Sequence, residues 1–138
     1  MGDVEKSLVF VKPDGVQKGL TGRIISRFEE KGFQILALKK FQMKKEMAEE
    51  HYAEHLGKHF FETLIKFITS SPIVAMIIEG RNAVETVRKM CGVTDSAKAE
   101  PGTIRGDFSL SGSENIIHAS DSLKSADREI KLFQKFLS

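Results

Sequence analysis

Residues 72–80, PIVAMIIEG, form the most strand-like run in the chain, because they are apolar, rich in isoleucine and valine, and bounded by a proline and a glycine. A second short apolar run, SLVFVK at residues 7–12, stops at Pro13 and also predicts a buried strand. Two further strands are predicted at residues 33–43, FQILALKKFQM, and 115–119, NIIHA. We therefore expect a sheet of four strands.

Segments that are rich in helix formers, or that carry apolar residues at helical spacing, lie between these strands. The predicted helices cover residues 21–32, 44–57, 59–70, 82–92 and 120–136. The expected N-terminal caps are Thr21, Asn82, and Ser120 or Ser122, and the expected helix ends are Gly32, Gly57 and Gly92. Residues 13–19, PDGVQKG, are expected to form a turn.

Residues 93–114 are polar, rich in glycine and serine, and show no usable periodicity. A loop of that length inside a compact domain is usually functional or disordered. The element order is then β-α-β-α-α-β-α-loop-β-α, which suits an α+β sandwich of the ferredoxin-like type. We expect a four-stranded antiparallel sheet covered by helices on one face, with a long functional loop before the last strand. A small flavodoxin-like sheet is the main alternative.

Composition limits the function classes. The length of 138 residues predicts one domain over residues 1–138. A formal charge of +2 is too weak to argue by itself for a nucleic-acid binder. The single cysteine, Cys91, rules out an internal disulfide, lacks a CxxC partner and fits a reducing compartment. No apolar run is long enough for a bilayer and no secretory signal is visible, so a cytoplasmic protein is expected.

Three histidines, at positions 51, 55 and 59, recur every four residues in HYAEHLGKH. This spacing would put His51 and His55 on one helical face, where they could bind a metal. However, the segment has no HExxH arrangement, and Gly57 interrupts the helix before His59. We therefore favour ordinary buried or solvated histidines over a metal site.

Basic side chains at Lys12, Arg88 and Arg105 come from distant parts of the chain. Gly102 and Gly106 flank Arg105 and leave the backbone free to approach a ligand. The chain has neither GxxxxGK[ST] nor GxGxxG, so a P-loop or a Rossmann cradle is not available. A phosphate site would have to be built from cationic side chains that converge from separate segments.

The stretch NIIHASDS, residues 115–122, places His118 between an apolar pair and a run of hydroxyls. A free imidazole has a pKa near ~6.5, so most of it is an unprotonated nucleophile at neutral pH. Such a ring can accept a phosphoryl group and pass it on, provided that one nitrogen is exposed and the other is fixed by an acceptor. Glu129 is a suitable acceptor. The alternative is a structural histidine at the end of a strand.

Four motifs, NIIHASDS, PGTIRGDFS, SLVFVKPDGV and HYAEHLGKHFF, together resemble the nucleoside diphosphate kinases and occur in that family's order. The resemblance extends over about residues 6–130. It implies ping-pong transfer of the γ-phosphate from a nucleoside triphosphate, usually ATP, to a nucleoside diphosphate. The intermediate would be a phosphohistidine on His118. It also implies Mg²⁺ as cofactor and a homo-oligomer, either a hexamer or a tetramer.

The resemblance also implies a role for individual residues. Glu129 would orient and polarise the second ring nitrogen of His118, with Ser120 bridging them. Lys12 and Tyr52 would contact the transferring phosphate.

Further residues would hold the rest of the nucleotide: the other phosphates (Arg88, Thr94, Arg105), the sugar 3′-hydroxyl (Asn115 with Lys12) and the base (Phe60 by stacking, with Leu64 and Gly112 beside it). Mg²⁺ would bridge the phosphates with help from Asp121 through water. Because every base has a π-face, stacking on Phe60 predicts broad base specificity.

The chain departs from the family pattern at four places. Ala119 replaces a glycine, which would cost ~1 kcal/mol if the position needs a positive φ. The pair Lys58-His59 replaces Arg-Pro. Ser96 replaces a proline, and this second replacement is expected to loosen the loop and weaken subunit contacts. The chain also ends at Ser138 without the longer tail of some relatives.

Two other functions compete with the kinase. The first is a binding or scaffold protein on the same fold that has lost catalysis. The second is a single-stranded nucleic-acid binder, which would need exposed aromatic residues on the sheet. The two central strand motifs offer almost only Phe10, so a nucleic acid is not expected as the primary partner.

Overall fold

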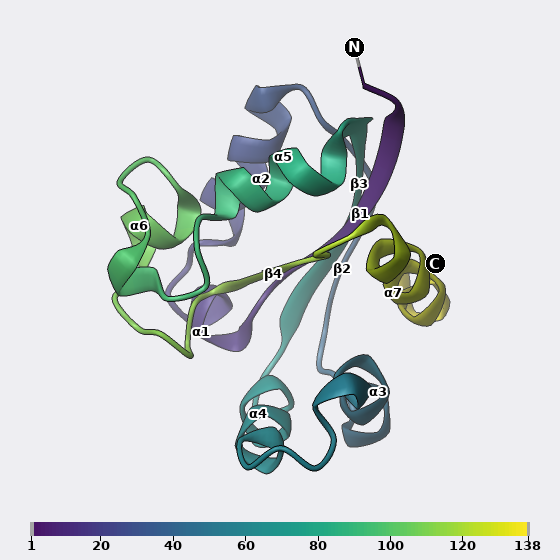
Figure 1. Cartoon of the computed structure of the whole chain (residues 1–138), viewed down its shortest axis with the longest axis vertical. Coiled ribbons are helices and arrows are strands. Elements are labelled where there is room, and N and C mark those ends of the chain that lie inside the picture. The colour runs from purple at the N-terminus through teal and green to yellow at the C-terminus, as the bar shows by residue number, and fades with distance from the viewer. Residues whose placement is uncertain (1, 138) are drawn as a thin grey trace.

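The computed structural model describes residues 2–137. Within this range, four strands form one antiparallel sheet in the order β2-β3-β1-β4 (Figure 1). The strands are β1 (Val4–Val11), β2 (Gln34–Phe41), β3 (Ile73–Arg81) and β4 (Ile117–Ala119). This order and pairing confirm the ferredoxin-like α+β fold. The flavodoxin-like alternative is wrong, because it requires parallel strands.

The helices alternate with the strands largely as the sequence predicts. They are α1 (Pro13–Gln17), α2 (Thr21–Lys31), α3 (Lys45–His51), α4 (Phe61–Ile68), α5 (Ala83–Cys91), α6 (Ile104–Phe108) and α7 (Leu123–Leu137), with 3₁₀ turns η1 (Ala53–His55) and η2 (Ser96–Lys98). Among residues 2–137, every helix is too short or too polar to cross a membrane.

Helices cover both faces of the sheet, so the prediction of a single covered face is wrong. On β1, Val9 packs in the cluster that contains α2 and α5, whereas Phe10 packs in the cluster that contains α3, α4 and α7. Figure 1 shows α2 and α5 on one side of the strands and α7 on the other. The reason is visible in SLVFV: consecutive apolar residues point to opposite faces of a strand, so both faces must be shielded from water.

Two local predictions fail for identifiable reasons. The turn predicted at residues 13–19 contains the short helix α1, which begins at Pro13, where a fixed φ and a missing N–H are both tolerated. The helix predicted over residues 44–57 ends at His51, and the chain turns at Tyr52 before η1. Both His51 and Tyr52 are buried, so packing of these rings overrides the helix propensity of the segment.

The cap predictions are right in part. Gly32 and Gly92 follow α2 and α5 with positive φ, as expected for helix ends. Thr21 is the first residue of α2 and is not its cap; Leu20 holds that position. Asn82 does precede α5, but its side chain makes no capping hydrogen bond. For α7, the sequence left Ser120 and Ser122 as alternative caps. The structure shows Ser122 as the cap, because its Oγ accepts a 3.0 Å bond from the Ser125 N–H.

The predicted loop at residues 93–114 is ordered by polar contacts instead of apolar periodicity. It contains η2 and α6. Asp107 accepts a 2.8 Å bond from the Gly102 N–H and a 2.6 Å bond from Arg27 of α2, which ties the loop to the body of the fold. The bond from Gly102, and to a lesser extent the bond from Arg27, hold the pKa of Asp107 below its ordinary value.

Ala119 carries no backbone strain. Among the described non-glycine residues, a positive φ occurs at Asn82 and Ile116, and Ala119 lies in regular pairing with Val9 of β1. The expected cost of a positive φ at this departure from the family pattern therefore does not arise.

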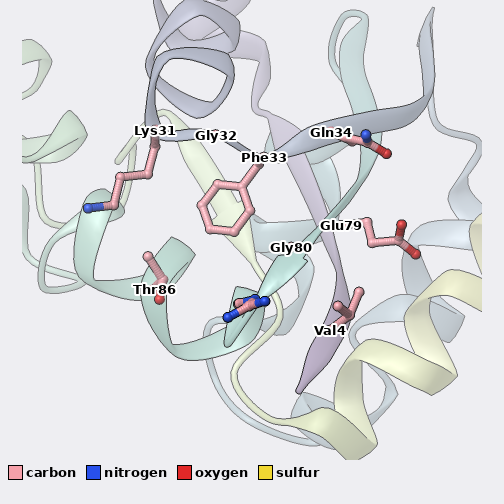
Figure 2. A pocket seen from close by; sticks show the side chains of 9 residues that line it. Val4, Lys31, Gly32, Phe33, Gln34, Glu79, Gly80 and Thr86 are labelled. Atoms are coloured by element: carbon pink, nitrogen blue, oxygen red, sulfur yellow. The ribbon is translucent and has the colours of Figure 1, made fainter. Parts of the chain in front are cut away.

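A pocket of about 600 Å³ lies where β2 begins and β3 ends (Figure 2). The ring of Phe33 lies against Gly80, and a side chain at that glycine would collide with the ring. Lys31 and Glu79 also line the pocket, but no site residue predicted from the sequence does. This pocket is therefore separate from the predicted site.

Ser96 is 3% exposed, and its hydroxyl has no hydrogen-bond partner among residues 2–137. A buried hydroxyl without a partner destabilises the folded state. We expect Ser96→Ala to raise the free energy of unfolding by about 1 kcal/mol, which corresponds to a thermal midpoint roughly 3 °C higher. Differential scanning calorimetry measures both quantities.

Ser109 provides the matched control. It is also buried, but its hydroxyl donates to the Glu114 carbonyl at 3.0 Å and accepts from the Ser111 N–H at 3.2 Å. Ser109→Ala should therefore lower the midpoint. Equal shifts in both variants would contradict the assignment of an unsatisfied hydroxyl to Ser96.

Candidate active site

His118 lies on β4 directly opposite Phe10 of β1. The two rings are stacked, with centroids 4.7 Å apart and an interplanar angle of 20°. The side chain is 19% exposed, so one edge of the ring reaches solvent. This placement differs from that of a fully buried structural histidine.

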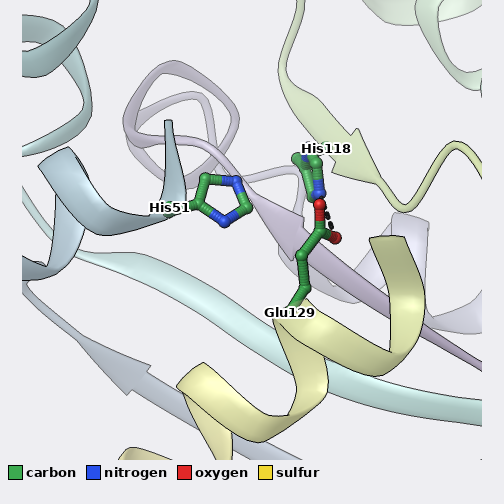
Figure 3. Close-up of side chains that lie close together, drawn as sticks. All are labelled: His51, His118 and Glu129. Carbon is green, nitrogen blue, oxygen red and sulfur yellow. Dashed lines mark hydrogen bonds and ion pairs between the residues drawn. The ribbon is translucent and has the colours of Figure 1, made fainter. Parts of the chain in front are cut away.

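Glu129 reaches His118 from α7 (Figure 3). Its Oε1 is 2.9 Å from His118 Nε2. An ionised carboxylate can only accept, so this contact places the imidazole proton on Nε2 and leaves the Nδ1 lone pair available. No residue within 2–137 makes a hydrogen bond to Nδ1. The arrangement therefore has the two features that the sequence argument required, one fixed nitrogen and one free nitrogen.

Ser120 connects this carboxylate to the backbone of β1. Its hydroxyl donates to Glu129 Oε1 at 2.7 Å and accepts from the Leu8 N–H at 3.1 Å. Ser120 therefore fixes Glu129 from the sheet side, whereas the resemblance implied a bridge between Glu129 and His118.

A group of cations and amides lies beside the histidine strand. Lys12 Nζ donates to Asn115 Oδ1 at 2.8 Å, and Asn115 Nδ2 donates to the Thr94 carbonyl at 2.8 Å. Arg88 donates to the Ala119 carbonyl at 3.2 Å from α5. The structure thus brings together residues that are far apart in the sequence.

Arg105 is held by main-chain carbonyls. Its guanidinium donates to the carbonyls of Gly92 at 2.8 Å, Ile117 at 2.7 Å and Asn115 at 3.3 Å. Burial lowers its pKa from the ordinary value. Gly106 beside it has no room for a side chain, because the Glu100 carbonyl lies against it. Packing within the loop therefore requires a glycine here.

The pKa of Lys12 is lowered from 10.5 to about 8, mainly by burial and then by repulsion from Arg105, while Asp14 opposes both effects. A buried ammonium loses its hydration shell, which disfavours the charged form. Lys12 is therefore poised to gain charge stabilisation from an incoming anion.

Ile116 has a positive φ of 61°, although it is β-branched and fully buried. Its N–H donates to the Asp14 carboxylate at 3.0 Å, and its carbonyl accepts from the Lys12 N–H at 2.8 Å. Strained backbone of this kind persists only where surrounding contacts hold it. Here α1 and β1 hold the turn that separates Asn115 from His118.

Tyr52 is buried with its ring centroid 4.6 Å from that of His51, and its hydroxyl has no hydrogen-bond partner in the described part of the chain. Burial, assisted by the negative charge of Glu129, raises its pKa far above the ordinary value. The phenol therefore stays protonated and can donate a hydrogen bond.

The residues implied in base binding lie at the start of α4. Phe60 is 38% exposed, with the ring of His55 at 5.3 Å and Lys58 Nζ at 5.7 Å from its centroid. Leu64, one turn later, is partly buried against the core. Lys58 also donates to His55 Nδ1 at 3.0 Å, so the departure from Arg-Pro leaves an ordered contact beside the phenyl ring.

The other predicted residues lie at the surface. Thr94 and Gly112 are exposed in the segment before β4. Asp121 is exposed after β4, and a hydrogen bond from Ser125 lowers the pKa of its carboxyl. Its carboxylate is therefore ionised at neutral pH.

Sequence reasoning missed the position of His51. The helix ends at this residue, so His51 and His55 do not form the predicted pair on one helical face. His51 is instead buried, with its ring centroid 4.8 Å from that of His118. No spacing rule connects positions 51 and 118; only the fold brings them together.

The family of the chain follows from comparison with known proteins. A family model described as nucleoside diphosphate kinase matches residues 5–136. A nucleoside diphosphate kinase from Methanocaldococcus jannaschii is 57% identical over 131 residues, which cover 95% of this chain and 94% of the relative. The chain belongs to the nucleoside diphosphate kinase family.

Solved structures of nucleoside diphosphate kinases share the fold. One from Halobacterium salinarum, in complex with CDP, has a TM-score of 0.93 at 47% identity and covers 95% of this chain, with 88% of its own chain matched. A transition-state mimic from Borrelia burgdorferi, with bound vanadate and ADP, has a TM-score of 0.88 at 41% identity, with 94% and 86% covered.

The chain is therefore an enzyme, a nucleoside diphosphate kinase that transfers phosphate between nucleotides. All the residues expected to react or to bind phosphate are present, which favours the kinase over the inactive scaffold. The geometry around His118 provides a nucleophile, and the neighbouring cations provide charge stabilisation.

The lowered pKa of Lys12 predicts a pH effect in this kinase. Between about pH 8 and 10.5, the folded chain has lost the Lys12 proton while the unfolded chain retains it. Folding stability from this group therefore rises with pH over that window. Phosphate binding has the opposite dependence, because the cation disappears. We expect kcat/KM to fall above pH 8, towards about tenfold per pH unit.

Lys12→Arg tests the cause. An arginine stays charged throughout this range, so the variant should keep a flat profile to about pH 10, whatever its absolute rate. Steady-state rates at low nucleotide concentration measure the profile. An unchanged decline in the variant would assign the pH effect to another group.

Proposed function

We propose that His118 carries the phosphoryl group between two nucleotides, in a ping-pong reaction from a nucleoside triphosphate, usually ATP, to a nucleoside diphosphate. The observation that carries this proposal is the His118 ring itself. Its Nε2 is held by Glu129 at 2.9 Å, while Nδ1 is free and the ring edge is exposed. A nucleophile held in this way has already lost the freedom that a reacting group must lose.

In the first half-reaction, the Nδ1 lone pair forms a bond to the γ-phosphorus, and the bond from that phosphorus to the bridging oxygen breaks. The electron pair leaves with the nucleoside diphosphate. Positive charge develops on the imidazole and is stabilised by Glu129 through the Nε2 proton. The second half-reaction reverses these steps on a different diphosphate.

Charge on the transferring group is stabilised by the groups around it. Lys12 and Tyr52 donate to the reacting phosphate, while Arg88, Thr94 and Arg105 hold the remaining phosphates. Charge-assisted hydrogen bonds of this kind contribute about 1–3 kcal/mol each. Asn115, with its amide fixed between Lys12 and Thr94, receives the sugar 3′-hydroxyl.

The residues present fit a magnesium ion on the phosphates. Mg²⁺ prefers oxygen ligands, keeps several waters and commonly uses one carboxylate together with substrate phosphates. Asp121 is an exposed carboxylate whose ionised form is favoured by a hydrogen bond from Ser125 and by the charges of Arg88 and His118, which supports this role. Bound Mg²⁺ would neutralise phosphate charge, with Asp121 holding it through water.

The base is proposed to stack on the exposed ring of Phe60, with Leu64 and Gly112 beside it. Stacking depends little on the identity of the base. This supports broad use of purine and pyrimidine nucleotides. A nucleic acid is not proposed as the main partner, since helices cover both faces of the sheet and leave no aromatic platform.

A homo-oligomer, hexamer or tetramer, is proposed as the working assembly. Strand β2 lies at one edge of the described sheet, and its Leu36 and Leu38 are exposed. An open strand edge with apolar side chains favours association with a second copy.

A cytoplasmic location is also proposed. Cys91 is a buried free thiol whose pKa is raised by burial to about 11, and a free thiol suits reducing conditions.

The mechanism predicts a covalent intermediate. We expect the protein, incubated with [γ-³²P]ATP and Mg²⁺, to acquire label that is acid-labile and base-stable, as for a phosphohistidine. His118→Ala should carry no label and should lose transfer by at least about 10⁴-fold, as expected for removal of a nucleophile.

His55→Ala is the matched control, because His55 lies near the nucleotide site but makes no contact with His118. It should retain most of its label and its rate. Label that persists in His118→Ala, or equal loss in both variants, would contradict the assignment of the carrier.

A further inference from the structure

His51 is a buried imidazole that the proposed mechanism does not use. It is 2% exposed, and within residues 2–137 neither Nδ1 nor Nε2 has a hydrogen-bond partner. A buried polar atom without a partner costs free energy in the folded state. Two such atoms on one ring beside the nucleophile therefore point to a ligand.

The surroundings of His51 provide two more metal-ligating groups. One ligand atom each from His51, His118 and Glu129 lie within 4.8 Å of one another. The two imidazole rings meet edge to face at 81°, so their in-plane lone pairs do not converge and one ring must rotate before both can bind the same ion. Figure 3 shows the three side chains converging from α3, β4 and α7.

We propose that His51, His118 and Glu129 form an inhibitory site for a divalent transition metal of the zinc class. Two imidazole nitrogens and one carboxylate oxygen are the donor set typical of zinc sites with an open fourth position. The fold brings the three ligands together, and their chemistry selects the ion. Imidazole suits Zn²⁺, Cu²⁺, Ni²⁺ and Co²⁺, whereas Mg²⁺ prefers oxygen and stays on the phosphates.

Closing the site requires rotation of one imidazole ring together with short shifts of the ligand atoms. Two ligands of one tetrahedral zinc lie roughly 3.4 Å apart, given metal–ligand distances of about 2.1 Å. The His118–Glu129 contact of 2.9 Å must open slightly, and His51 must approach by up to about 1.4 Å. Burial, followed by repulsion from His118, lowers the pKa of His51 well below its ordinary value, so it is ready to act as a neutral ligand.

Metal binding at Nε2 would switch the nucleophile off by tautomerism. In the free site, the Nε2 proton faces Glu129 and the lone pair is on Nδ1. When Nε2 donates its lone pair to the metal, the ring proton must move to Nδ1, and Glu129 changes from hydrogen-bond acceptor to ligand. Nδ1 then has no lone pair for phosphorus. This inhibitory consequence, unlike the metal site itself, rests on the proposed function of His118.

The first experiment detects the ion directly, without nucleotide. Tag-free protein is titrated with Co²⁺, whose visible absorption becomes intense in a tetrahedral site with nitrogen ligands, and Zn²⁺ is then added to displace it. We expect one Co²⁺ per chain in the wild type. His51→Gln should weaken binding by at least about 100-fold, because loss even of an outer partner commonly costs 10–100-fold.

Two further variants make the result decisive. His118→Ala removes a second ligand from a partly exposed position and should also lose the spectrum, so the test does not depend on the stability of His51→Gln. His55→Ala should bind Co²⁺ as the wild type does. Absence of a tetrahedral spectrum in the wild type, or its loss in His55→Ala, would overturn the site.

The second experiment tests inhibition. Labelling by [γ-³²P]ATP with excess Mg²⁺ should fall in the wild type as Zn²⁺ is added, over the range in which Zn²⁺ displaces Co²⁺. Labelling of His51→Gln, relative to its own metal-free rate, should resist Zn²⁺ by a similar factor of about 100. Binding without any effect on labelling would overturn the inhibitory role. A wild type that takes no label without zinc would instead contradict the proposed function.

Discussion

The carboxylate of Glu129 is the contact on which the reactive centre depends. Its Oε1 accepts from His118 at 2.9 Å and from Ser120 at 2.7 Å, and Ser120 is itself bound to the β1 backbone. Helix α7, strand β4 and strand β1 are thereby joined at one buried oxygen. The position of α7 on the sheet therefore determines which imidazole nitrogen is free. In this protein, packing of a helix against a sheet sets the protonation pattern of a nucleophile.

The phosphate site has a different origin, because main-chain groups position most of its side chains. Carbonyl oxygens of Gly92, Asn115 and Ile117 orient Arg105, and the Thr94 carbonyl orients the Asn115 amide. The carbonyls of Asn115 and Ile117 lie on either side of Ile116, whose positive φ is retained by the Asp14 carboxylate. Backbone strain at one residue thus contributes to the ordering of cations several residues away.

The sequence predicts those parts of the fold that depend on local pattern. Apolar runs predicted the strands, and Gly32 and Gly92 predicted helix ends. Both predictions depend only on local properties, namely the apolar pattern of a strand and the ease with which glycine adopts a positive φ. The break after His51 was not predictable, since burial of its ring against Phe10 and Phe133 overrides a good helix sequence. Motifs indicated His118 and Glu129, whereas the proximity of His51 and the strain at Ile116 arise only from tertiary structure.

Lys12 couples the proposed phosphate site to the proton concentration of the solvent. At a pH close to its pKa of about 8, roughly half of these side chains are uncharged. In the proposed binding mode, a phosphate beside Lys12 restores the ammonium by supplying negative charge, so the protein takes up a fraction of a proton from the buffer as the ligand binds. The heat of nucleotide binding therefore contains the ionisation heat of whichever buffer gives up that proton.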